Sequence, residues 1–80
     1  SIAKEVAARN ITVNAVAPGF ISTEIVAGIT PEFRKLIISR IPLGAFGEVE
    51  DVASLVAFLA SDKGKYITGE VIRVDGGIEL

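Results

Sequence analysis

Apolar residues recur along the chain with the three-to-four-residue spacing of a helix in some stretches and in unbroken runs in others. Residues 1–10 and 48–62 show the helical spacing. A further helix is predicted to begin at Thr30, a good capping residue, with Pro31 in its first position. Its apolar stripe ends before Pro42, which cannot continue a helix.

Two apolar, β-branched runs predict strands, residues 11–17 and 70–74, whereas residues 20–29 show no clear period. Both runs are apolar on both faces, which is typical of strands buried in a parallel sheet. The order α-β-α-α-β gives a right-handed crossover with two parallel strands. Such a sheet is too small to stand alone, because its edges are unpaired and one face lacks a helix. We therefore expect an α/β fold in which the chain is the end of a larger, doubly wound sheet.

The composition narrows the function classes. The chain has 80 residues, 50% of them hydrophobic, a net charge of −2, and neither cysteine nor histidine. Thiol catalysis, disulfides, thiolate zinc sites, histidine-ligated metals and a Ser-His-Asp triad are thereby excluded. The weak negative charge argues against nucleic acid or an anionic membrane as the main partner. No apolar run approaches the roughly 20 residues of a membrane span and the first residues do not resemble a signal peptide, so we expect a cytoplasmic protein.

Few side chains could carry acid–base chemistry. Tyr66 is the only tyrosine, and we expect its ring to pack against the last helix. The acidic residues Glu48, Glu50 and Asp51 lie at the start of a predicted helix, where they compensate its dipole. Asp75 fits a turn that ends a strand, and a role as a ligand is the alternative.

Two features of the first strand bear on function. Asn14 is an amide within an apolar strand and needs hydrogen-bond partners, so we expect it to tie the strand to a neighbouring loop. Residues 18–23 follow the carboxyl end of this strand, where open α/β sheets bind ligands. Gly19 would let a ligand approach the backbone, and Thr23 offers a hydroxyl. From the residues alone, a plain turn and a ligand site are equally supported.

Several short motifs together resemble the short-chain dehydrogenase/reductase family. They follow the family's order and spacing over essentially the whole chain, as NAVAPGFIST (14–23), IPLG (41–44), FG (46–47), EDVA (50–53), VAFLASD (56–62), YITG (66–69) and VDGG (74–77). The chain is most similar to the β-ketoacyl-acyl-carrier-protein reductases, although sugar and alcohol dehydrogenases share this C-terminal half. The resemblance implies that residues 1–80 are the C-terminal portion of a single Rossmann-type domain, with the last two strands of its doubly wound parallel sheet.

The resemblance also implies a nicotinamide cofactor, NADP or NAD, beside the segment that follows the first strand. Pro18 and Gly19 would contact the nicotinamide ring through their backbone, and Ile21 would bond the carboxamide through its main chain. The Thr23 hydroxyl would reach the carboxamide or the diphosphate. Residues 22–41 correspond to a mobile lid over the substrate.

The activity implied is hydride transfer between nicotinamide and a carbonyl or hydroxyl substrate, namely reduction of 3-oxoacyl chains on acyl carrier protein in fatty acid synthesis. The alternatives are another alcohol or sugar dehydrogenase, or a non-catalytic fragment that acts only by association. The family's glycine-rich loop and its catalytic Ser, Tyr and Lys have no counterpart here. We therefore expect a C-terminal fragment, inactive alone, whose partner is the N-terminal half of the same domain.

The helix over residues 48–62 is apolar around more than one side, since Phe58 and several alanines widen its stripe. The strand over residues 70–74 is the last in the chain and hence a sheet edge with unpaired backbone groups. Packing against the same elements of a second copy would satisfy both. Family members commonly associate through this helix and strand, so we expect a homo-tetramer with Phe58 near an interface.

Overall fold

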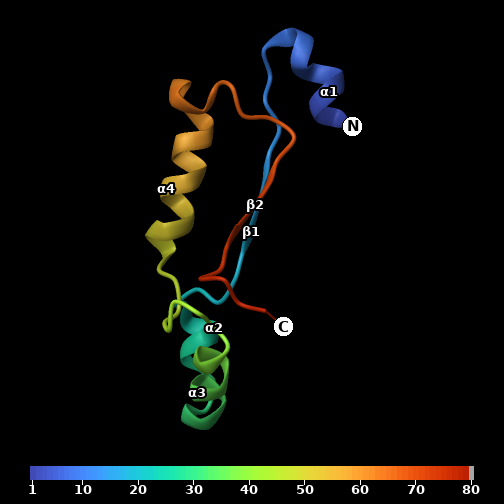
Figure 1. Ribbon diagram of the computed structural model, residues 1–80. Coiled ribbons are helices and arrows are strands. Elements are labelled where there is room, and N and C mark those ends of the chain that lie inside the picture. The colour runs from blue at the N-terminus through green and yellow to red at the C-terminus, as the bar shows by residue number, and fades with distance from the viewer. Residues whose placement is uncertain (80) are drawn as a thin grey trace.

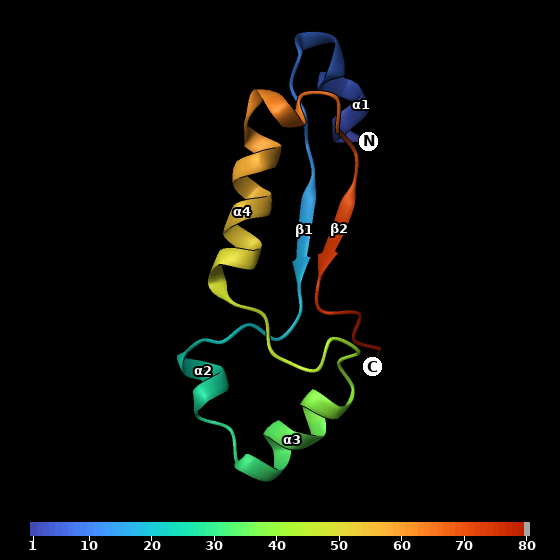
Figure 2. The ribbon, with the colours of Figure 1, turned by 60° about the vertical axis from the view of Figure 1, so that its left-hand side comes forward.

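The computed structural model describes residues 1–79 and has the predicted order of helices and strands, with one short helix added. α4 runs along the two strands, and α2 and α3 extend beyond the strands' carboxyl ends (Figure 1). The two strands lie side by side (Figure 2). The helix α1 lies at the opposite end of the strands (Figure 2). The elements are α1 (Ile2–Val6), the 3₁₀ turn η1 (Ala7–Arg9), β1 (Ala15–Pro18), α2 (Glu24–Ala27), α3 (Pro31–Ser39), α4 (Val49–Ala60), the 3₁₀ turn η2 (Asp62–Gly64) and β2 (Val71–Val74).

The helices α3 and α4 begin where the sequence predicts, whereas α4 ends at Ala60, two residues earlier than predicted. The Thr30 hydroxyl accepts a hydrogen bond from the Phe33 N–H at 3.2 Å and thereby caps α3. At the start of α4, the Asp51 carboxylate accepts from the Glu48 N–H at 2.7 Å. The helix α1 continues into the 3₁₀ turn η1, which ends at Asn10 in the left-handed conformation with φ of 60°.

The strands β1 and β2 form a parallel pair in which Val16 lies beside Ile72 and Pro18 beside Val74. This pairing confirms the predicted crossover. The first strand is shorter at its start than predicted, because it begins at Ala15 rather than at residue 11.

Ahead of Ala15, side-chain hydrogen bonds join the two segments beside one backbone bond, from the Gly69 N–H to the Val13 carbonyl at 2.8 Å. The Asn14 amide donates to the Ile67 carbonyl at 3.1 Å, and its Oδ1 accepts from the Glu70 N–H at 3.1 Å. Just before it, the Val13 N–H donates to the Thr68 hydroxyl at 3.0 Å. Asn14 thus ties the strand to the loop before β2, as the sequence predicts.

The sheet has one half-buried face and one exposed face within residues 1–79. The register places Val16 and Ile72 on the same face, and both are half-buried. On the opposite face, Val71 is 69% exposed and Ala15 is also exposed. α4 packs against β1 (Figure 2).

The molecule is elongated, with extents of 50 × 21 × 19 Å. Its radius of gyration is 15.7 Å, against about 12 Å for a compact chain of this length. The accessible surface is 6176 Å², whereas a compact protein of this mass exposes about 4,600 Å². The open shape agrees with the expectation that so small a sheet needs neighbours.

One expectation about packing is wrong for the described residues. Tyr66 does not pack against the last helix, because α4 ends at Ala60, η2 intervenes, and the tyrosine is 99% exposed. On α4, Val56 and Phe58 are 49% and 42% exposed in the single chain, and the interface expected there with a second copy stays a prediction. In residues 1–79, no helix combines the length and apolarity needed to cross a membrane.

Candidate functional site

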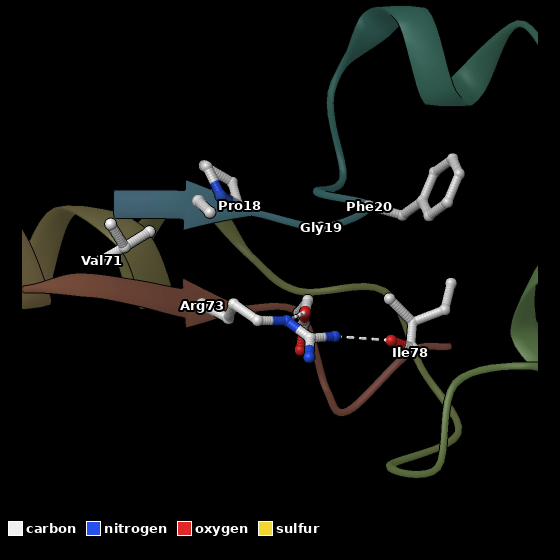
Figure 3. Close-up of a pocket in the computed structure, with 8 residues that line it drawn as sticks. Pro18, Gly19, Phe20, Val71, Arg73 and Ile78 are labelled. Atoms are coloured by element: carbon white, nitrogen blue, oxygen red, sulfur yellow. Dashed lines mark hydrogen bonds and ion pairs between the residues drawn. The ribbon is translucent and has the colours of Figure 1, made fainter. Parts of the chain in front are cut away.

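A cavity of about 620 Å³ opens at the carboxyl ends of the two strands (Figure 3). One side comes from β1 and the residues after it, and the other from β2 and the turn that follows. Open α/β sheets bind ligands at this edge. The lining residues are Ala17, Pro18, Gly19, Phe20, Val71, Arg73, Asp75 and Ile78.

A larger hollow, of about 860 Å³, lies at the amino ends of the strands. Asn10, Asp62, Lys65 and Tyr66 are among its lining residues. Because ligand sites of parallel sheets form at the carboxyl ends of the strands, the smaller cavity is the stronger candidate.

Gly19 lies where the two strand ends approach each other most closely. Its N–H donates to the Val74 carbonyl at 2.9 Å, which continues the strand pairing by one residue. A Cβ atom at this position would lie 2.5 Å from the Asp75 Cβ and 2.8 Å from the Asp75 Cα. A side chain therefore cannot be added without separating the strand ends.

The residues after Gly19 are held by the loop that precedes α4. Ile21 forms an isolated parallel bridge with Gly47. The Gly47 N–H donates to the Phe20 carbonyl at 2.9 Å, and the Ser22 N–H donates to the Gly47 carbonyl at 2.8 Å. Because these bonds use the groups on either side of Ile21, its own N–H and C=O are directed away from Gly47. They are suitably placed for an amide ligand on that side.

Thr23 lies at the entrance to α2. Its carbonyl accepts from the Ala27 N–H at 2.9 Å and so begins that helix, while the residue itself is exposed. Pro18, Gly19, Ile21 and Thr23 thus follow one another along a single backbone path, with only Pro18 and Gly19 lining the cavity.

Arg73 and Asp75 are the charged residues that line the cavity. The Arg73 Nε donates to the Asp75 Oδ2 at 2.6 Å, and the Gly77 N–H donates to the Asp75 Oδ1 at 2.9 Å. The Gly77 N–H and then the Arg73 guanidinium lower the pKa of Asp75, against the opposing effect of partial burial. The lowered pKa favours the ionised carboxylate. Asp75 lies in a turn that ends a strand, as the sequence predicts.

The predicted lid, residues 22–41, contains α2 and α3 and is anchored on a small apolar cluster. Ile37 and Ile41 are buried together with Ile78 from the C-terminal turn. Phe20 and Phe46 stack beside this cluster with ring centroids 6.1 Å apart. The core of the molecule therefore lies under the lid rather than under the sheet.

A cationic residue of α3, Arg34, contacts one of these two aromatic rings. The Arg34 guanidinium carbon is 4.5 Å from the Phe46 ring centroid, in a cation–π contact. Within the described part of the chain, no group of three or more acidic side chains could hold a metal ion.

The sequence-based interpretation missed the participation of Arg73 and Ile78 in this cavity. Their proximity to Gly19 depends on the strand register, which pairs Pro18 with Val74 and so brings Gly19 beside Asp75. The one available signal was the pair of turn motifs, Pro-Gly and Asp-Gly-Gly, at the ends of two strands predicted to be parallel.

A family model described as enoyl-(acyl carrier protein) reductase matches residues 1–79. The chain is 55% identical over 78 residues to the 3-oxoacyl-[acyl-carrier-protein] reductase of Thermotoga maritima, covering 98% of this chain and 32% of that protein. It is 55% identical over 80 residues to the enzyme of the same name from Haemophilus influenzae, covering all of this chain and 33% of that protein. The chain thus spans about a third of the length of these curated relatives.

The fold agrees with that of a solved relative. The crystal structure of the 3-oxoacyl-[acyl-carrier protein] reductase from Brucella melitensis superposes with a TM-score of 0.94 at 34% sequence identity. The match covers 99% of this chain and 30% of the other. The arrangement of α1 to β2 is therefore that of the matching third of a complete enzyme domain.

Proposed function

Because the chain belongs to the short-chain dehydrogenase/reductase family, we propose that it is the C-terminal portion of a single Rossmann-type oxidoreductase domain. The complete domain would reduce 3-oxoacyl chains on acyl carrier protein in fatty acid synthesis. The observation that carries this proposal is the Pro18–Gly19 turn at the carboxyl edge of the sheet, in a chain whose relatives bear that activity in their names. Residues that complete the domain in those relatives would supply the glycine-rich loop and the catalytic Ser, Tyr and Lys.

The cofactor, NADP or NAD, supplies the hydride when bound. The chain's own contribution is backbone that can approach and orient a nicotinamide ring, at Pro18 and Gly19. The main-chain groups of Ile21, directed away from Gly47, fit a carboxamide. The exposed Thr23 hydroxyl would bond the carboxamide or the diphosphate.

Residues 22–41 would cover the substrate. In the short helix α2, Glu24 and Ala27 are exposed and Val26 is half-buried, whereas α3 is held at Ile37 by the apolar cluster with Ile41 and Ile78. The Ser22 N–H bond to the Gly47 carbonyl holds the other end of the segment. Movement of α2 between these two held ends would suit a lid that must admit an acyl chain. Copies of the domain would associate through α4 and β2 into a homo-tetramer in the cytoplasm.

The match to the enoyl-(acyl carrier protein) reductase family model supports a second candidate, reduction of an enoyl chain. The two reactions differ in the bond reduced: the first converts a ketone to an alcohol, and the second saturates a carbon–carbon double bond. The names of the relatives favour the ketone.

The test uses the complete oxidoreductase that contains this chain. Consumption of NADPH and NADH would be followed with an acetoacetyl thioester and with a crotonyl thioester. Reduction of NADP+ and NAD+ would be followed with a simple secondary alcohol or sugar. We expect fastest turnover of the acetoacetyl thioester. Turnover of the crotonyl thioester alone would favour enoyl reduction, and activity of residues 1–80 by themselves would contradict the assignment of catalysis to residues outside this chain.

A further inference from the structure

The C-terminal turn that follows β2 contacts both parts of the candidate site. This turn, residues 75–78, lies between the Gly19 backbone and the anchored end of the lid. It is distinct from the residues that the proposed function assigns to the cofactor, yet it lines the same cavity through Asp75 and Ile78 (Figure 3).

The segment proposed to contact the cofactor, residues 18–23, meets the end of β2 at Val74 and the turn at Asp75. The Gly19 N–H bonds the Val74 carbonyl at 2.9 Å. The space beside the Gly19 Cα is filled by the Asp75 Cβ, which an added methyl would approach to 2.5 Å. The position of Asp75 thus limits where the Gly19 backbone can lie.

The same turn contacts the lid through its other end. Ile78 is 6% exposed and packs with Ile37 of α3 and with Ile41. The Leu43 N–H donates to the Gly76 carbonyl at 3.2 Å, and a Cβ on Gly76 would lie 2.7 Å from the Ile41 Cγ2. The end of the lid is therefore seated directly on the turn.

Arg73 closes the turn by bonding both of its ends. Its Nε donates to the Asp75 Oδ2 at 2.6 Å, and its Nη2 donates to the Ile78 carbonyl at 2.7 Å (Figure 3). The Asp75 Oδ1 meanwhile accepts from the Gly77 N–H. Because Gly76 and Gly77 both have positive φ and are flexible in the unfolded chain, these side-chain bonds restrict a segment that glycine would otherwise leave loose.

We propose that Arg73 and Asp75 are positioning residues that hold the Gly19 backbone and the lid base in one fixed relation. Arg73 bonds both ends of the turn, Asp75 limits where the Gly19 backbone can lie, and Ile78 packs against the base of the lid. Assigning these two parts to cofactor and substrate rests on the proposed function, whereas the mechanical coupling rests on the contacts alone. A turn with only a local role would affect neither segment.

The test compares four variants of the complete oxidoreductase with the parent. Asp75→Ala removes both carboxylate bonds, Asp75→Asn keeps an acceptor for the Gly77 N–H, and Arg73→Leu removes the clamp. Lys63→Leu is the matched control, because Lys63 is an exposed cation in η2 at the other end of the sheet. Amide hydrogen exchange is measured without ligand over residues 18–23 and 31–43.

We expect Asp75→Ala and Arg73→Leu to speed exchange about tenfold in both segments, as for loss of a charge-assisted bond, with Asp75→Asn intermediate. The NADPH dissociation constant and the KM for the acetoacetyl thioester should rise by about the same factor, with kcat changed less. Lys63→Leu should match the parent in every measurement.

Exchange in both segments at the parent rate in a folded Asp75→Ala variant would overturn the proposal, as would faster exchange confined to residues 75–78. If that variant does not fold, Asp75→Asn and Arg73→Lys carry the same test with a smaller expected change. An inactive parent that nevertheless shows the exchange pattern would contradict the proposed function and support the coupling, so the two failures are distinguishable.

Discussion

Replacing Gly19 with alanine tests the close approach on which the candidate site depends. The added Cβ would lie 2.5 Å from the Asp75 Cβ and 2.8 Å from the Asp75 Cα. Carbon atoms in contact are normally about 3.5–4.0 Å apart. The Gly19 backbone and the turn after β2 must therefore separate by about 1 Å, because the atoms in contact include backbone.

The cost of this separation has two parts. Forcing a methyl into a packed position costs about 1–3 kcal/mol. The Gly19 N–H bond to the Val74 carbonyl, 2.9 Å in the parent, would be stretched beyond hydrogen-bond range and lose about 0.5–1.5 kcal/mol. We expect a total loss of about 2–4 kcal/mol, shared between folding stability and cofactor binding.

The assay separates these two effects. Urea unfolding of the complete enzyme reports stability, and a fluorescence titration with NADPH reports binding. If only about 1.4 kcal/mol of the cost reaches the binding equilibrium, the dissociation constant rises about tenfold. Gly44→Ala is the matched control, since it also adds a methyl but meets no atom within 4 Å, although its φ of +78° costs stability.

The reasoning would be refuted by a Gly19→Ala enzyme with both the parent's dissociation constant and its urea midpoint. Loss of binding in Gly44→Ala equal to that in Gly19→Ala would also contradict it, because general destabilisation would then explain both. A weakened Gly19→Ala beside a Gly44→Ala that binds normally is the expected result.

Further predictions concern the cofactor, the assembly and the turn. Thr23→Val should weaken NADPH binding by about tenfold or less, through loss of one hydroxyl bond, and an unchanged titration would remove Thr23 from the site. Phe58→Glu would bury an unpaired charge if α4 pairs copies, so light scattering should show a smaller species; an intact, folded oligomer would exclude that interface. Residues 1–80 alone should lose circular dichroism in urea without a cooperative transition, given their open shape; a cooperative transition at low concentration would contradict this. An NMR titration should place the pKa of Asp75 below its ordinary value. In Arg73→Leu this pKa should be higher than in the parent but still below the ordinary value, because the Gly77 N–H contributes most to lowering it. The turn's stabilisation is then complete above about pH 4 and is lost as pH falls through the lower folded-state pKa.

Local structure followed from the sequence wherever its cause is local. Thr30 caps α3 and Asp51 bonds the start of α4, because each acts on an N–H only three residues away. Asn10 ends the 3₁₀ turn that follows α1 because its side chain tolerates the left-handed conformation. The parallel pairing of β1 with β2 also followed, since helices between two apolar strands leave few other topologies.

Features set by distant neighbours did not follow. The first strand begins at Ala15 because Val13 and Asn14 are bonded by the loop before β2, more than fifty residues away. The expectation for Tyr66 was wrong because burial is a property of what packs against a residue, and within residues 1–79 little covers this ring.

The candidate site also combines features with local causes and features set by distant neighbours. The sequence placed Pro18 and Gly19 after a parallel strand, as either a plain turn or a ligand site, because a turn at this edge of a sheet is a local pattern. Only the tertiary structure brought Arg73, Asp75 and Ile78 to that turn. Their proximity results from strand register, and register is decided by which backbone groups of two remote segments pair, information that no local pattern of residues contains.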